Sequence, residues 1–267
     1  MRKCVLTIAG SDSGAGAGIQ ADMKSVAAQG VYCLTAITAI TAQNTTAVKK
    51  VQMLDLEIIE AQIDAVMSDF PVTVVKTGML GSAPIIELVA AKLKQYRIKK
   101  VVLDPVMVAK SEDLLLEEGA QTALQQELFP LASIITPNIP EAEVLCGRSL
   151  EDAGALKEAA RFLHEAGVSS VLLKGGHVQG KRMVEDILFD GERYYYYRAP
   201  RVDTKDTHGT GCTFAAAIAA HLALGKTVPL AVKAARDYLQ SILPHGLNLG
   251  HGSGPMDHFA GKGCLYV

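Results

Sequence analysis

The sequence predicts an α/β fold of three layers, in which a mostly parallel central sheet is covered by helices on both faces. Short runs of β-branched and apolar residues alternate with segments whose apolar residues recur at helical spacing, as expected where helices connect parallel strands. The 267 residues are 49% hydrophobic, which is enough for one large buried core. No linker or repeat divides the sequence, so we expect a single domain over residues 1–267.

The predicted strands share a high content of Val, Ile, Leu and other apolar residues over a short length. They span residues 4–9, 31–41, 72–76, 101–103, 133–136, 171–173, 184–189 and 193–198. Asp190-Gly191 separates the last two strands and is typical of a tight hairpin turn. Most of the others end in polar residues or glycine, and in such sheets ligands bind beyond the carboxyl ends of the strands.

The predicted helices have apolar residues at helical spacing or begin at a capping residue. They span residues 19–29, 56–67, 82–96, 114–128, 140–145, 152–166, 212–224 and 228–243. Residues 107–113 have no clear period, so this segment is predicted to be a loop.

The stretch DTHGTGCTFAAAIAAHLAL, residues 206–224, combines a glycine turn with an alanine-rich helix. Gly209 and Gly211 bracket the turn, and the first N–H groups of a helix lack partners within the helix. The helix dipole adds positive potential there, so the turn suits an anion such as phosphate. A buried helix with an ordinary cap explains the glycines alone equally well.

A second glycine-rich segment, SGAGAG at residues 13–18, allows close approach to a ligand. It is not a dinucleotide fingerprint, because Ile19 occupies the third glycine position. Gly225-Lys226-Thr227 is not a P-loop either, since Ala220 stands in place of the upstream glycine.

Several chemically active residues follow predicted strands, where the carboxyl ends of the strands meet at one edge. They are Asp12, Gln43, Asn44, Lys76, Thr77, Asp104, Asn138, Glu141, Lys174, Asp206 and Cys212. Each alone is compatible with a turn-forming role. Together they offer carboxylates for a metal, lysines for phosphate charge and a turn for an anion, which favours phosphoryl transfer.

Composition excludes several functions. The net charge of −2 argues against nucleic-acid binding, and Tyr194–Tyr197 lack interleaved Lys or Arg and are predicted to form an exposed strand. Five scattered cysteines predict neither a zinc site nor a disulfide framework, which favours a reducing compartment. No apolar run is long enough to cross a bilayer. We therefore expect a cytoplasmic protein.

The chain resembles the ribokinase-like superfamily and, within it, the hydroxymethylpyrimidine/phosphomethylpyrimidine kinases of thiamine synthesis. The motifs that carry the resemblance run in family order over essentially the whole chain. They are TIAGSDSGAGAGIQAD (7–22), ITAQNT (40–45), VKTGML (75–80), VVLDPVMVAKS (101–111), ITPNIPEAE (135–143), LLKGGH (172–177), DTHGTGCTFAAA (206–217) and GHGSGP (250–255).

The resemblance implies roles at the matching positions. Gln43 and Asp22 would hydrogen-bond an aminopyrimidine and its hydroxymethyl group, and the implied substrate site also includes Gly10, Met79 and Val106. Asn138 and Glu141 would hold or orient Mg²⁺, with Asp104 in support. The residues implied at the nucleotide and its transferring phosphate are Lys174, Thr207, Gly209, Thr210 and Gly211.

Most of the superfamily has an Asp base where this chain has Cys212. We predict that the helix N-terminus lowers the pKa of this thiol; the alternative is a small packing residue. His208 is interpreted as either a structural cap or a proton carrier. The remaining histidines considered, His177, His221, His245 and His251, are predicted to be surface or loop residues.

The resemblance implies an ATP- and Mg²⁺-dependent kinase that phosphorylates 4-amino-5-hydroxymethyl-2-methylpyrimidine and then its monophosphate, which gives the pyrophosphate. Relatives of this kind are often homodimers. A pyridoxal or pyridoxine kinase is the nearest alternative, and Ala109, where many pyridoxal-phosphorylating relatives carry a cysteine, favours the pyrimidine. A vitamin- or nucleotide-binding protein without catalysis is the alternative from another class.

Overall fold

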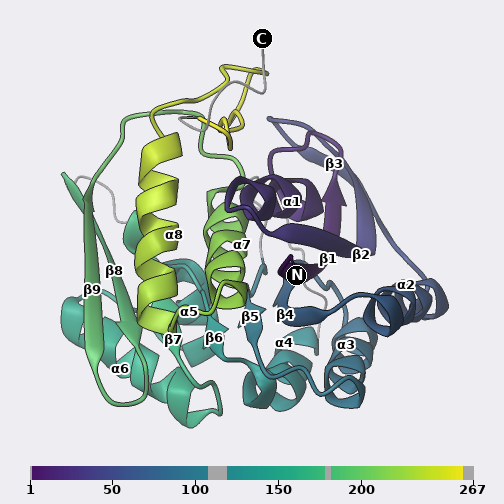
Figure 1. Ribbon diagram of the computed structural model, residues 1–267. Helices are drawn as coiled ribbons and strands as arrows, with labels where there is room; N and C mark the ends of the chain where they lie inside the picture. Colours follow the sequence, from purple (N-terminus) through teal and green to yellow (C-terminus); the bar gives the residue numbers. More distant parts are fainter. Residues whose placement is uncertain (1, 108–118, 178–181, 261–267) are drawn as a thin grey trace.

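The computed structural model describes residues 2–107, 119–177 and 182–260, which form a nine-stranded sheet flanked by helices (Figure 1). The strands are β1 (Cys4–Asp12), β2 (Tyr32–Gln43), β3 (Val48–Met53), β4 (Val72–Thr77), β5 (Val101–Leu103), β6 (Ile134–Ile135), β7 (Val171–Leu173), β8 (Met183–Phe189) and β9 (Tyr194–Pro200). Their spatial order is β3-β2-β1-β4-β5-β6-β7-β8-β9.

The centre of the sheet is parallel and its edges are antiparallel. Strands β2, β1, β4, β5, β6 and β7 pair in parallel, whereas β3, β8 and β9 join by antiparallel pairing. The chain moves from β1 to β2 on one side and later returns to β4 on the other. The sheet therefore reverses its winding between β1 and β4, where α/β sheets commonly bind ligands.

The helical elements alternate with the strands as the sequence predicted. They are α1 (Gly18–Ala28), α2 (Leu56–Asp69), α3 (Ala83–Gln95), α4 (Ala120–Ala123), the π-helical turn η1 (Leu124–Leu128), the short turn η2 (Phe129–Leu131), α5 (Ile139–Cys146), α6 (Ala153–Glu165), the short turn η3 (Gly175–His177), α7 (Thr210–Ala223) and α8 (Val228–Ile242). None of the helices within the described ranges is long and apolar enough to cross a membrane.

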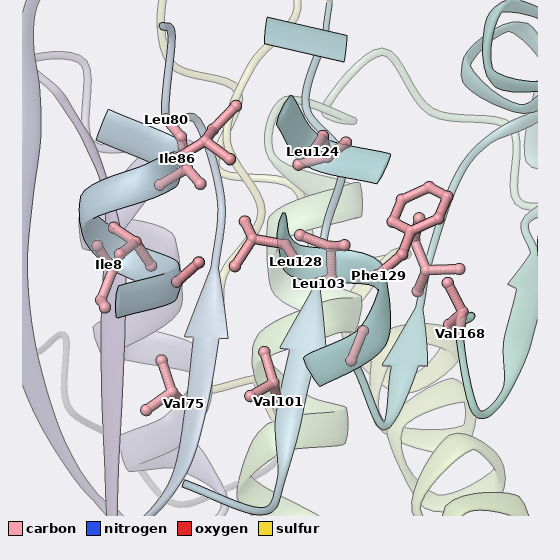
Figure 2. Packing of buried hydrophobic residues seen from close by; sticks show 14 of the residues in the cluster. Ile8, Val75, Leu80, Ile86, Val101, Leu103, Leu124, Leu128, Phe129 and Val168 are labelled. Atoms are coloured by element: carbon pink, nitrogen blue, oxygen red, sulfur yellow. The ribbon is translucent and has the colours of Figure 1, made fainter. Parts of the chain in front are cut away.

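Two hydrophobic clusters cover the two faces of the sheet. On β5, Val101 and Leu103 point into the cluster beneath α2 to α6, whereas Val102 between them points into the cluster beneath α1, α7 and α8. Figure 2 shows the first cluster, in which Leu128 and Phe129 lie near the strand residues. Both faces of the central strands are apolar, as expected for a buried parallel sheet, and the predicted three-layer arrangement is confirmed.

The structure differs from the predictions at β3 and at His221, and one predicted segment lies almost entirely outside the described residues. Strand β3 was not predicted, because its sequence VKKVQM is polar and largely exposed and lacks the apolar run of a buried strand. His221 lies buried in α7 rather than on the surface or in a loop, so that prediction was wrong. The predicted loop 107–113 and the start of the helix predicted at 114–128 fall almost entirely outside the described residues.

Candidate active site

A cavity of about 510 Å³ lies at the carboxyl ends of the parallel strands. Nearly all the site residues implied by the sequence line this one space. They are Gly10, Gln43, Met79, Asp104, Val106, Asn138, Glu141, Lys174, Thr207, Gly209, Thr210, Gly211 and Cys212. Asp22 and Asp206 do not line it.

The start of α7 faces the cavity with its N–H groups free of any side-chain cap. Gly209 is the residue before the helix, with a left-handed φ of 79°, and its carbonyl accepts the N–H of Thr213 at 2.9 Å. Main-chain donors at an uncapped helix N-terminus favour an anionic ligand. The turn therefore has the geometry that the sequence predicted for a phosphate site.

The two glycine turns of the chain touch each other. A Cβ atom on Gly209 would lie 1.8 Å from the carbonyl oxygen of Gly16, and one on Gly16 would lie 2.2 Å from Cδ2 of His208. Real Cβ contacts are essentially never shorter than 3.0 Å. Glycine at both positions is what lets the loop before α1 and the turn before α7 pack together.

The first glycine turn is filled by a carboxylate of the protein itself. Asp12 Oδ1 accepts the N–H of Gly14 at 2.8 Å, and Oδ2 accepts the N–H groups of Gly16 and Ala17 at 3.0 and 2.8 Å. His208 Nε2 lies 2.9 Å from the same Oδ2. Burial opposes ionisation of Asp12, but His208 and the N–H donors outweigh it and lower the Asp12 pKa. This turn is thus an internal anchor, and its partner His208 acts as a link between the turns.

Several of the implied substrate residues in the cavity lining have defined neighbours. Gln43 Nε2 lies 3.3 Å from His208 Nε2, and Gln43 Oε1 accepts the hydroxyl of Thr41 at 3.2 Å. A Cβ atom on Gly10 would lie only 3.2 Å from the sulfur of Met79. Glycine at position 10 therefore keeps open the space beside Met79.

A buried ion pair occupies the middle of the cavity. Lys174 Nζ lies 3.0 Å from Asp104 Oδ1, which also accepts the hydroxyl of Thr136 at 2.9 Å. Burial works against both charges, but the neighbouring groups together outweigh it. Asp104 and Glu141 raise the pKa of Lys174, and Lys174, Lys76 and the Thr136 hydroxyl lower that of Asp104. A Cβ atom on Gly211 would lie 3.3 Å from Lys174 Nζ, so this ammonium sits beside the start of α7.

Asn138 and Glu141 have a local structural role that sequence analysis overlooked. The N–H of Glu141 donates to Asn138 Oδ1 at 2.8 Å, and the N–H of Asn138 donates to Glu141 Oε2 at 2.8 Å. This is a capping box at the start of α5. Burial raises the pKa of Glu141 to about 7.

Mg²⁺ fits this cavity only as part of a nucleotide complex. Within the described ranges, no group of three or more His, Cys, Asp or Glu residues could hold a metal ion. Asp104 and Glu141 do bring two carboxylates to the cavity. Mg²⁺ is commonly held by one or two carboxylates together with substrate phosphates, so these two residues match that type of site, while the Asn138 oxygen is engaged in the cap.

Asp22 is fully buried below the cavity, so a direct contact with substrate does not fit its position. Its oxygens lie 2.9 and 3.0 Å from Lys76 Nζ, and Oδ2 accepts the hydroxyl of Thr7 at 2.5 Å. Lys76, in contrast, lines the cavity. Asp206 is held elsewhere too, where its Oδ2 accepts the N–H of Asn248 at 3.0 Å.

Cys212 lies in the first turn of α7 and lines the cavity, but the predicted lowering of its pKa was wrong. Burial raises the pKa of this thiol to about 11, and Lys76 only partly offsets the effect. The helix N-terminus favours a thiolate, yet removing the thiol from water disfavours it more strongly here.

Four further residues of the cavity lining were missed by sequence analysis. They are Phe214 of α7, Arg236 and Gln240 of α8 and Asp186 of β8. Arg236 Nε lies 3.3 Å from Asp186 Oδ2. The available signal was weak: Arg236 and Gln240 are four residues apart and therefore share one face of a predicted helix.

Curated proteins are similar to this chain over nearly its whole length. A thiamine biosynthesis bifunctional protein of Geobacter sulfurreducens is 51% identical over 96% of this chain, which spans only 52% of that protein. The hydroxymethylpyrimidine/phosphomethylpyrimidine kinase of Haemophilus influenzae is 47% identical, and the match covers 97% of both chains.

Solved structures match over most of their length as well. An ADP complex of Bacillus subtilis pyridoxal kinase has a TM-score of 0.90 at 37% identity, covering 98% of this chain and 99% of that one. A phosphomethylpyrimidine kinase of Clostridium difficile has a TM-score of 0.79 at 42% identity, covering 89% and 98%. These matches confirm the predicted ribokinase-like fold. Because the family model for phosphomethylpyrimidine kinase matches residues 12–257, the chain belongs to the phosphomethylpyrimidine kinase family.

Proposed function

We propose that this protein is an ATP- and Mg²⁺-dependent kinase that phosphorylates 4-amino-5-hydroxymethyl-2-methylpyrimidine and then converts the monophosphate to the pyrophosphate. The observation that carries the proposal is the convergence of three features on one cavity. These are the uncapped N-terminus of α7, the Lys174–Asp104 pair and the thiol of Cys212.

The nucleotide and the alcohol are assigned to opposite ends of the cavity. The apolar side chains of Phe214, Leu239 and Leu243 suit a nucleobase. The triphosphate then extends toward Lys174 and the N–H groups of Thr210 and Gly211. The pyrimidine occupies the end formed by Gln43, Gly10, Met79 and Val106. Related pyridoxal kinases have been solved with ADP and with AMP-PCP, which supports the use of a nucleotide.

In the proposed reaction, the hydroxyl oxygen of the substrate attacks the γ-phosphorus. A new O–P bond forms as the bond between the γ-phosphorus and the β–γ bridging oxygen breaks, and ADP leaves with that electron pair. The hydroxyl proton passes to the sulfur of Cys212 in its thiolate form, which arises when the resting thiol first releases its own proton to solvent. Lys174 and the α7 N–H groups stabilise the charge on the transferring group. Mg²⁺, held by Asp104 and Glu141 together with the phosphates, would neutralise further phosphate charge.

ADP release from purified protein, MgATP and the pyrimidine alcohol tests this proposal; absence of turnover would overturn it. Cys212→Ala tests the role of the thiol. We expect loss of turnover with ATP binding retained, as measured by a thermal shift with MgATP. Turnover at the wild-type rate would make Cys212 a packing residue.

Pyridoxal phosphorylation is the second candidate, because a Staphylococcus aureus pyridoxal kinase solved with AMP-PCP and pyridoxal has a TM-score of 0.91 at 34% identity. The kcat/KM values for the two alcohols separate the candidates. A binding protein without catalysis is disfavoured by the joint presence of Lys174, Asp104, Glu141 and Cys212 in the cavity. We further propose one catalytic domain, a homodimer and a cytoplasmic location; light scattering tests the dimer and cell fractionation the location.

A further inference from the structure

The floor of the cavity contains a lysine for which the reaction described above has no role. Lys76 of β4 is fully buried, yet it is one of the residues that line the cavity. Its Nζ lies 2.9 and 3.0 Å from the two oxygens of Asp22, which is also fully buried. The hydroxyl of Thr7 donates to the same carboxylate at 2.5 Å. This ammonium is therefore fixed in place from below.

The chain leaves specific room for this ammonium. A Cβ atom on Gly78 would lie 2.9 Å from Lys76 Nζ and 2.9 Å from Cβ of Ala9. Gly78 is itself part of the cavity lining. The Lys76 ammonium thus lies against the backbone that follows its own strand.

Titratable groups from several neighbouring elements surround this point. Asp22 comes from α1, Cys33 from β2 and Cys212 from α7, and Asp104 follows β5. Burial opposes the charge on Lys76, but Asp22, Cys212 and Asp104 together outweigh it and raise the Lys76 pKa, so the ammonium stays charged. Among charged groups, Lys76 has the strongest effect on the thiol of Cys212 and lowers its pKa, whereas burial, Asp22 and Asp104 raise it.

Fold stability alone gives little reason for this pair. A buried ion pair generally contributes no more than well-packed apolar residues of similar volume, because both charges lose their hydration. A pair whose cation lines the same reaction cavity as a nucleophilic sulfur has a second use.

We propose that Lys76 is a positioning residue of the kinase: its ammonium, locked by Asp22, stabilises the thiolate form of Cys212 while the substrate proton is transferred to sulfur. The inference rests on the proposed function for its effect on turnover. Its effect on the thiol is independent of turnover.

The test uses the double variant Asp22→Asn/Lys76→Met, which removes both charges and keeps similar volumes, so that no unpaired charge is left buried. At pH 8 to 9 we expect alkylation of Cys212 by iodoacetamide, followed by mass spectrometry of its peptide, to slow about threefold, because the effect of Lys76 on the thiolate fraction exceeds the opposing effect of Asp22. We expect kcat to fall by about the same factor in this pH range, with KM nearly unchanged. Lys92→Met, which removes a lysine paired with Asp64 outside the cavity, is the matched control and should change neither rate.

A folded double variant with wild-type alkylation and a wild-type pH–rate profile would overturn the inference. If this variant does not fold, Asp22→Leu/Lys76→Met carries the same test without a buried polar group. Failure of the proposed function gives a different result from failure of this inference. The wild-type protein would then release no ADP with the pyrimidine alcohol, while the alkylation rates would still report whether Lys76 acts on Cys212.

Discussion

Replacing Gly209 by alanine tests the most demanding contact in the site. The residue has a φ of 79°, which costs an alanine about 1–2 kcal/mol. Its new Cβ would also lie 1.8 Å from the carbonyl oxygen of Gly16. To reach the shortest real contact of 3.0 Å, one of the two turns must move by about 1.2 Å. Both partners are backbone, so no side-chain rotation relieves the clash.

Gly225, just after the other end of α7, provides the matched control. It also has a positive φ, of 90°, but a Cβ there meets nothing within 4 Å. Gly225→Ala should therefore cost only the conformational term of about 1–2 kcal/mol. Gly209→Ala adds strain of about 1–3 kcal/mol, typical of overpacking, and displaces the α7 N–H groups.

The two variants should differ most in activity. A displacement of about 1 Å in a reacting geometry can lower the rate about 100-fold, so we expect kcat/KM of Gly209→Ala to fall by that order. Gly225→Ala should stay within about twofold of wild type, since its turn lies away from the cavity. ADP release and urea denaturation of both proteins measure the two effects. If Gly209→Ala keeps the activity of Gly225→Ala, a fixed main-chain phosphate site at this turn is refuted.

Two further predictions concern stability. Burial lowers the pKa of His258 to about 3 from an ordinary value of 6.5; between these values only the unfolded chain binds the proton. The free energy of unfolding should therefore decrease as pH falls below 6.5, by up to about 1.4 kcal/mol per pH unit. Urea denaturation at pH 7 and pH 5 should show a smaller decrease for His258→Gln than for the wild-type protein. An equal decrease in both proteins would contradict this prediction. Ala15 has a left-handed φ of 59°, which is strained for alanine. Ala15→Gly should therefore stabilise the protein by about 0.5–1 kcal/mol and raise its Tm. A lower Tm would show that Ala15 is not strained in this way.

The assembly of the site could be predicted because parallel strands bring distant residues to one edge. Asp104 and Lys174 follow β5 and β7, and their side chains meet at 3.0 Å across a separation of 70 residues. Alternation of strand and helix was enough to place both residues at that edge. The contacts within the edge were less predictable, because they depend on which side chains turn inward.

Asp22 and the pair Asn138 and Glu141 illustrate this limit. Asp22 follows the first glycine turn, but it lies on the buried side of α1, where Lys76 is its partner. The pattern of Asn138 followed by Glu141 is also a capping-box pattern, and sequence analysis interpreted it only as a metal site. In both cases a local structural use of the carboxylate was available from physical chemistry and was overlooked. Strand β3 was missed for a different reason, because its residues are mostly exposed and carry no apolar pattern.

The error at Cys212 has a consequence for how the cavity binds phosphate. A thiol with a pKa of about 11 is neutral at rest, whereas an Asp at this position would place a permanent charge beside the incoming phosphates. The two lysines are each matched by a carboxylate, Lys76 by Asp22 and Lys174 by Asp104. Each of these two ammonium groups is therefore balanced by a carboxylate in the resting cavity. The main-chain donors of α7 add to the attraction that Lys174 offers the transferring group, and their position depends on the contact between Gly209 and Gly16. For this reason a small displacement of the glycine turn should cost much of the activity.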